Sequence, residues 1–121
     1  MEKIRVLVAN RPRLMRELVL ATISEQPDIE VVGEIQDDTA LARVVAESKP
    51  DFVILTLDGR DQRPRICDRL LEHNPNMKII ALAPERNRGV CIWAVKEIRS
   101  SSVESSEEGI LKALRAKLQL V

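Results

Sequence analysis

The sequence of 121 residues is poor in aromatic residues, histidine and cysteine. Phe52 and Trp93 are its only Phe, Trp or Tyr residues, too few for the stacking platforms that bind single-stranded nucleic acid. One histidine, His73, and two cysteines without CxxC spacing make neither a zinc site nor a disulfide framework. We therefore expect Cys67 and Cys91 to be reduced residues in or near the core, and His73 to lie at a helix end.

The chain also lacks net charge and long apolar runs. Nineteen basic residues balance nineteen acidic ones, which argues against broad, charge-driven binding to nucleic acid or membranes, although a local patch is compatible with this balance. No apolar run approaches the roughly 18 residues of a membrane helix, and the first residues lack the pattern of a signal peptide. We expect a cytoplasmic protein that binds neither membranes nor, directly, nucleic acid.

Apolar residues nevertheless make up 45% of the sequence, which excludes a disordered chain. The length is that of one domain, and no linker, internal repeat or low-complexity tract divides it. We therefore expect a single domain over residues 1–121, which either stands alone or is part of a longer protein.

Apolar, β-branched runs alternate with segments of helical spacing. The runs predict strands over 4–9, 29–34, 52–58, 78–83 and 98–103. The segments between them predict helices over about 12–24, 38–48, 64–75, 86–97 and 106–118. In the first helix, Leu14, Leu18 and Ala21 or Ile23 form the predicted apolar stripe. The last helix follows a capping-box pattern, and its predicted apolar face consists of four aliphatic residues, Ile110, Leu111, Leu114 and Leu118.

Five strand–helix units predict an α/β, three-layer, flavodoxin-like fold with a five-stranded parallel sheet of order 2-1-3-4-5. The run 52–58 is almost continuously apolar, as expected for a central strand covered on both faces. Ligands and chemistry in such folds lie at the carboxyl ends of the first and third strands. This places Asn10, Arg11, Thr56 to Asp58, and the residues after Ala83 at the predicted site.

Several segments resemble the receiver domains of bacterial response regulators. "IRVLVANRPRLMRELV" is similar to their first strand and helix, "KPDFVILTLDGRD" to their third strand, "MKIIALAP" to the fourth and "SSEEGILKALRA" to the last helix. The resemblance covers essentially the whole chain. It implies a signalling module of a two-component or phosphorelay system, in which an acidic pair holds Mg²⁺ and an aspartate accepts a phosphoryl group.

The residues at those positions depart from the family pattern. The acidic pair falls on Asn10 and Arg11, the acceptor aspartate on Thr56, and the switch serine or threonine on Ala83. No lysine stands near 102–103, where the resemblance places one. Phosphoryl transfer to a carboxylate needs a divalent cation, which carboxylates hold. The sequence therefore predicts an atypical receiver without Mg²⁺ and without standard aspartyl phosphorylation.

Two other sites of phosphorylation stay open at this point. Asp58 lies two residues after Thr56, on the same face of an extended strand, and would be a displaced acceptor in a Mg²⁺-dependent phosphoreceiver. Its simpler interpretation is a turn residue at the start of a loop. The hydroxyl of Thr56 is a candidate for a serine/threonine kinase, although a buried strand end is hard for a kinase to reach.

Arginines gather at the predicted carboxyl edge of the sheet. A guanidinium cluster beside helix N-termini would suit a small anionic ligand such as a nucleotide, whereas the simpler interpretation pairs these arginines with nearby acids. The arginines of this possible anion-binding edge are Arg11, Arg13, Arg60, Arg63, Arg86 and Arg88. The acids beside them are Asp37, Asp38, Asp58, Asp61 and Glu85.

No nucleophile–base pair or metal cluster indicates an enzyme. We expect signalling through protein–protein contact, with a partner or as a homodimer. The contact surface is either the face of the predicted helix 86–97, strand 98–103 and last helix, or the face of the first and last helices. The former face presents Trp93, Val95 and Ile98, and Trp93 is either a surface anchor or a core residue.

Overall fold

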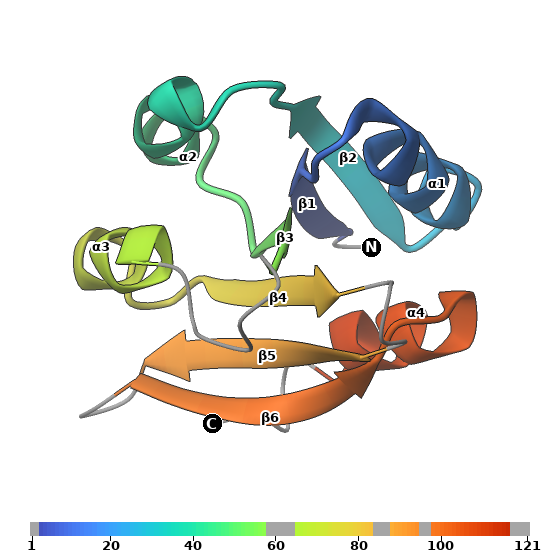
Figure 1. Cartoon of the computed structure of the whole chain (residues 1–121). Coiled ribbons are helices and arrows are strands. Elements are labelled where there is room, and N and C mark those ends of the chain that lie inside the picture. The colour runs from blue at the N-terminus through green and yellow to red at the C-terminus, as the bar shows by residue number, and fades with distance from the viewer. Residues whose placement is uncertain (1–2, 58–64, 84–87, 95–97, 117–121) are drawn as a thin grey trace.

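A computed structural model describes residues 3–57, 65–83, 88–94 and 98–116 of the chain (Figure 1). It contains one six-stranded sheet in the order β2-β1-β3-β4-β5-β6. The strands are β1 (Ile4–Ala9), β2 (Ile29–Glu34), β3 (Phe52–Thr56), β4 (Lys78–Ala83), β5 (Arg88–Ala94) and β6 (Ile98–Glu104). Strands β1 to β4 pair in parallel, as the sequence predicts.

The described residues form four α-helices, which cover the two faces of this sheet (Figure 1). Their bounds are α1 (Arg13–Ile23), α2 (Leu41–Ser48, after the 3-10 turn η1, Asp38–Ala40), α3 (Arg65–His73) and α4 (Glu107–Arg115). Helices α1 and α4 pack on one face and α2 and α3 on the other. The three-layer, flavodoxin-like architecture is therefore confirmed. Within the described residues no helix is long and apolar enough to cross a membrane.

The central strands are apolar on both faces because helices cover both. In β3, Phe52 and Ile54 contact the core beneath α1 and α4, whereas Val53 and Leu55 contact the core beneath α2 and α3. Three of these four side chains are fully buried. This explains the near-continuous apolar run, since a strand covered on one face only would alternate with polar residues.

The predicted apolar stripe of the first helix is correct at Ile23 but wrong at Leu14 and Leu18. Leu14 and Leu18 are 67% and 58% exposed, and the buried face of α1 consists of Met15, Val19 and Ile23. Both sets have the same helical spacing, so the pattern alone does not separate them. Helix α1 is thus rotated about its axis relative to the prediction, and this rotation also turns Arg16 inward.

The predicted helix over 86–97 is also wrong, and with it the five-stranded, fully parallel sheet. Residues Arg88–Ala94 form β5, which is antiparallel to β4 and to β6. The segment holds Val90, Ile92 and Trp93, residue types that strands favour. Gly89 permits the close approach of β5 to β4, because a Cβ there would lie 2.8 Å from the Ala81 carbonyl oxygen. The predicted strand over 98–103 is present as β6, one place further from the centre.

Helix α4 begins as the capping pattern indicates, with Ser106 as its N-cap. The Ser106 hydroxyl accepts a hydrogen bond from the Gly109 N–H at 3.0 Å. The predicted inward residues Ile110, Leu111 and Leu114 are buried, while Leu118 lies outside the described residues. At the other end of α4, Arg115 binds Asp28, which follows α1, at 2.9 Å.

Candidate functional site

The carboxyl ends of β1 and β3 meet at the Thr56 side chain. Its hydroxyl donates a hydrogen bond to the Arg11 carbonyl at 3.0 Å. The same oxygen accepts hydrogen bonds from Asn10 Nδ2 and from the Arg11 N–H, both at 3.1 Å. The proton and the two lone pairs of this hydroxyl are thus all in use. The structure brings together three of the predicted site residues through one threonine.

Asn10 is completely buried directly after β1, and its Oδ1 has no hydrogen-bond partner. Its amide nitrogen is held by Thr56, as described above. The backbone carbonyl oxygen of Asn10 accepts a hydrogen bond of 3.5 Å from Arg16 Nη1. A neutral amide therefore occupies the first position of the predicted acidic pair.

The buried Arg16 is a site residue that the sequence reasoning missed. Its guanidinium, on the inner face of α1, lies 3.5 Å from a carboxylate oxygen of Glu34 at the end of β2. The side chain of Arg16 is only 7% exposed, while that of Glu34 is 49% exposed. Nothing in the spacing marks this arginine, because the predicted stripe pointed Leu14 and Leu18 inward. Its buried positive charge lies next to the backbone carbonyl of Asn10.

The remaining predicted site positions contribute no carboxylate among the described residues. Ala83 is half-buried at the end of β4 and offers only a methyl group. Asp37 is exposed, and its pKa is lowered by hydrogen bonds from Thr39, with a smaller contribution from the charge of Arg11. Asp58 lies outside the described residues. In the part of the chain that the structure describes, no three His, Cys, Asp or Glu side chains gather at a metal-binding distance.

The predicted arginine edge is described only in part. Arg13 is exposed, and its guanidinium pairs at 2.9 Å with Glu17, which lies one helical turn further along α1. This agrees with the simpler of the two interpretations, in which the arginines pair with nearby acids. Arg11 is exposed near Asp37. The other members are outside the described side chains: Arg60, Arg63, Arg86 and Arg88. The anion-binding edge therefore stays a prediction.

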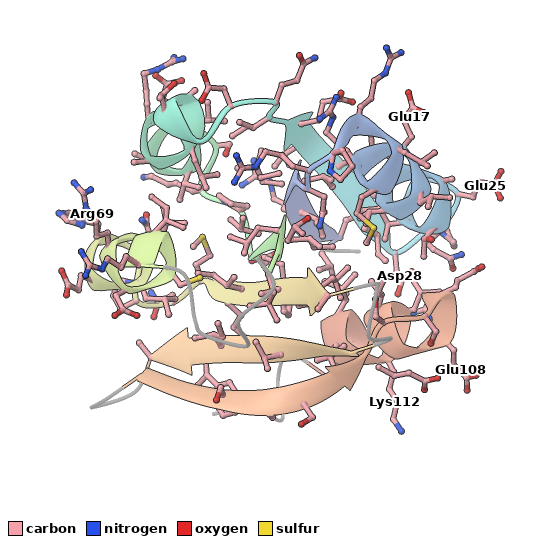
Figure 2. The ribbon with its side chains drawn as sticks, viewed as in Figure 1. Glu17, Glu25, Asp28, Arg69, Glu108 and Lys112 are labelled. Carbon is pink, nitrogen blue, oxygen red and sulfur yellow. The ribbon has the colours of Figure 1, made fainter. Side chains whose placement is uncertain are left out.

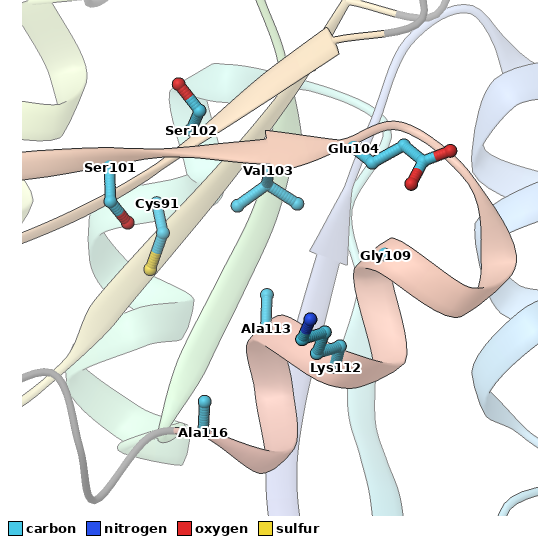
Figure 3. A pocket seen from close by; sticks show the side chains of 9 residues that line it. All are labelled: Cys91, Ser101, Ser102, Val103, Glu104, Gly109, Lys112, Ala113 and Ala116. Atoms are coloured by element: carbon cyan, nitrogen blue, oxygen red, sulfur yellow. The ribbon is translucent and has the colours of Figure 1, made fainter.

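A pocket lies between α4 and the β5–β6 hairpin, on the face opposite α2 and α3 (Figure 3). Its volume is about 300 Å³, and the side chains of Cys91, Ser101, Ala113 and Ala116 are turned towards it. Burial raises the pKa of the Cys91 thiol to about 11, so this thiol is protonated at neutral pH. Cys67 is also buried, and neither cysteine forms a disulfide, as expected for thiols in or near the core.

Trp93 is half-buried in β5 and packs against the core shared with α1 and α4. Its indole nitrogen is buried without a hydrogen-bond partner. Of the other residues predicted on this face, Val95 and the side chain of Ile98 lie outside the described part of the structure. Trp93 is therefore closer to a core residue than to an exposed contact anchor.

Comparison with known proteins relates the chain to response regulators. The transcriptional regulatory protein LiaR of Bacillus subtilis is 35% identical over 72 residues, which are 55% of this chain and 34% of that protein. A protein-glutamate methylesterase/protein-glutamine glutaminase of Cupriavidus pinatubonensis is 33% identical over 92 residues, 72% of this chain and 24% of the relative. A similar enzyme of the group 3 operon of Bradyrhizobium diazoefficiens is 35% identical over 91 residues, covering 63% of this chain and 25% of its own length.

The chain thus spans between about a quarter and a third of the length of these curated relatives. Among solved structures, the response regulator domain of Thermotoga maritima CheB matches with a TM-score of 0.55 and 26% identity, over 66% of this chain and 60% of that one. No protein-family model matches the sequence. In sequence and in fold, the chain is similar to the receiver domains of response regulators.

Proposed function

We propose that this chain is a receiver-like signalling module that works without aspartyl phosphorylation and acts through contact with other proteins. The observation that carries the proposal is the arrangement around Thr56. The resemblance to receivers places the phosphoryl acceptor at this position, at the end of the central strand β3. A threonine stands there instead, and its hydroxyl is fully used in joining β3 to the end of β1.

The residues around Thr56 do not fit the Mg²⁺ that the resemblance implies. Magnesium prefers carboxylate oxygens, and carboxylates also neutralise its charge. The two positions of the acidic pair hold the neutral Asn10 and the cationic Arg11, and the guanidinium of Arg16 lies behind them. Two positive charges and a neutral amide disfavour a divalent cation. We therefore expect neither metal-dependent phosphoryl transfer nor enzymatic activity from this site.

The hydrogen-bonded Thr56 hydroxyl is also a poor substrate for a protein kinase. Its proton is donated to the Arg11 carbonyl, and both lone pairs accept hydrogen bonds. A kinase would have to break all of these contacts before the oxygen could attack a phosphate. Phosphorylation of Thr56 is therefore not the switch that we propose.

Helix α1 provides a surface for the proposed protein contact. Leu14 and Leu18 lie one turn apart and are the two large hydrophobic residues that are strongly exposed among the described residues. Figure 2 shows Glu17 on α1, and Glu25 just after it, projecting outward from the molecule. Exposed leucines at this spacing are typical of a helix that docks into an apolar groove of a partner. This corresponds to the predicted contact face that includes the first helix.

Incubation with acetyl phosphate and Mg²⁺, followed by measurement of the intact mass, tests the proposal. We expect the mass to remain unchanged, while a receiver domain that carries the acidic pair and the acceptor aspartate gains a phosphoryl group under the same conditions. Asp58→Ala is the matched control. A phosphoryl adduct on the unmodified chain that disappears in Asp58→Ala would identify Asp58 as a displaced acceptor and overturn the proposal.

A further inference from the structure

The outer edge of β6 is open among the described residues. β6 is the last strand of the sheet, and its seven residues pair with β5 on one side. A strand in this position presents a row of backbone N–H and C=O groups that a further strand can bind. The side chains of Ser100, Ser102 and Glu104 are exposed, so no part of the chain that the structure describes covers the strand on their face.

The opposite edge of the sheet, at β2, is protected in two ways that the middle of β6 lacks. The pairing of β2 with β1 is irregular, because Leu7 pairs with Gly33 while Val6 pairs with Val31. Glu30 and Glu34 also place charges on this edge strand, both within ion-pair distance of arginines. Bulges and charges are common means of keeping an edge strand from pairing with another chain.

The β6 edge has neither form of protection along its middle. Its register with β5 runs without a break from Glu104 to Ile98. Its sequence, IRSSSVE, contains no proline and no lysine, and its three central residues are serines. An edge strand of this length and regularity is suited to receive another strand.

We propose that the β6 edge binds β6 of a second copy of this chain, antiparallel about a two-fold axis at Ser101. The two sheets then continue into one another. This goes beyond the proposed function, because it makes the phosphorylation-independent module a constitutive dimer. The contact is isologous, so one pairing satisfies the open edge of both copies.

The order of residues in β6 favours the second copy as the occupant. An antiparallel pairing centred on Ser101 sets Ser100 opposite Ser102 of the other copy, so small hydroxyl side chains face one another and the backbones can approach closely. The same register sets Arg99 opposite Val103 and Glu104 opposite Ile98 of the other copy, whereas in-register parallel pairing would set each charged residue opposite its own copy.

Two double variants with the same number of new charges test this register. S100K/S102K sets lysine opposite lysine at both symmetric positions of the dimer, whereas S100K/S102E sets lysine opposite glutamate. Both changes lie on exposed positions, so we expect both proteins to keep the thermal unfolding midpoint of the parent chain. We expect S100K/S102K to weaken the dimer about tenfold or more and S100K/S102E to retain it.

Sedimentation velocity of the full chain over a range of concentrations, together with light scattering, measures the dimer. A dimer that S100K/S102K dissociates and S100K/S102E preserves supports the proposal. A monomeric parent chain, a dimer that resists both variants, or a dimer that both variants dissociate would each overturn it. A dimer lost only in Leu18→Glu would place the contact on α1 instead. None of these outcomes depends on the acetyl phosphate experiment, so failure of one proposal is distinguishable from failure of the other.

Discussion

The parallel part of the sheet and the β5–β6 hairpin are built from different kinds of strand. The central strands β3 and β4 are covered by helices on both faces and consist almost entirely of buried aliphatic residues. In the hairpin, β5 is largely apolar, but β6 has three consecutive serines, two of them exposed. The parallel part fixes the position of Asn10 and Thr56, whereas the hairpin leaves an edge on which another chain can bind.

The difference follows from one exchange of secondary structure. Where the alternation of strands and helices predicts a helix over 86–97, the chain forms a strand antiparallel to β4. A helix there would cover the sheet face next to α3 and leave the following strand adjacent to β4. Instead, the hairpin widens the sheet by one strand, and among the described residues α4 is the helix that packs on β6. We therefore expect the two regions to respond differently to substitutions and to pH.

The largest expected effect is that of a methyl group added where α4 meets β6. A Cβ at Gly109 would lie 2.2 Å from the Glu104 carbonyl oxygen and 2.9 Å from its carbonyl carbon, both backbone atoms. Because neither atom can move without shifting the strand or the helix, we expect Gly109→Ala to lower the free energy of unfolding by about 3 kcal/mol. Urea denaturation followed by circular dichroism measures this loss.

Gly33→Ala is the matched control in the parallel part. A Cβ at Gly33 would lie 3.1 Å from Leu7 Cδ1, the end of a side chain that can yield. We therefore expect a loss below about 1 kcal/mol. Equal losses for the two variants would contradict the view that the seam between α4 and β6 is the more rigid contact.

Titration of Cys91 gives the next largest effect. Burial raises its pKa from 9.0 to about 11 in the folded chain, so the unfolded chain loses this proton first as the pH rises. Stability is unaffected below about pH 9 and falls between pH 9 and 11, by about 2 to 3 kcal/mol in total. Denaturation across this range should show the fall in the parent chain and a smaller one in Cys91→Ala. Parallel pH profiles for the two proteins would contradict the assignment.

The strands of the parallel part were predictable because their cause is local. Runs such as 52–55 and 79–82 are apolar at every position, and few structures other than a covered strand explain such runs. The segment 88–94 was not predictable in the same way. Its residues favour a strand, but the alternation of strands and helices in the rest of the chain favoured a helix. Antiparallel pairing with β4 makes this segment a strand. Such pairing is a contact between two segments and not a property of the local sequence.

The candidate site was predictable in its positions but not in its contacts. Parallel topology alone brings the ends of β1 and β3 together, and hence Asn10 and Thr56. The role of Arg16 was hidden, because two apolar stripes of equal spacing compete on α1. The rotation of α1 that buries Arg16 brings it to Glu34, which lies on strand β2, 18 positions further along the sequence. Such a pairing leaves no periodic signal.

Loss of the Thr56 hydroxyl should have an intermediate effect. Thr56→Val keeps the shape of the side chain but leaves the buried Asn10 amide and the Arg11 N–H without their partner. We expect the free energy of unfolding to fall by about 2 kcal/mol, and by less than about 1 kcal/mol in Thr56→Ser, which retains a hydroxyl. Chemical denaturation at neutral pH compares the two. If valine were tolerated as well as serine, the hydroxyl would not be the joint between β1 and β3 that we describe.

The smallest effect concerns the ion pair that links α4 to the turn between α1 and β2. Hydrogen bonds from Arg115 lower the pKa of Asp28 below its usual 3.8. The stabilisation is therefore present above pH 3.8 and is lost as the pH falls through the lowered value. Arg115→Gln should lower the thermal midpoint slightly near neutral pH, and this difference should disappear as the pH falls through the lowered pKa of Asp28. Because the pair is exposed, its neutral-pH effect should shrink in concentrated salt, and a salt-independent difference would indicate lost packing of the arginine stem instead.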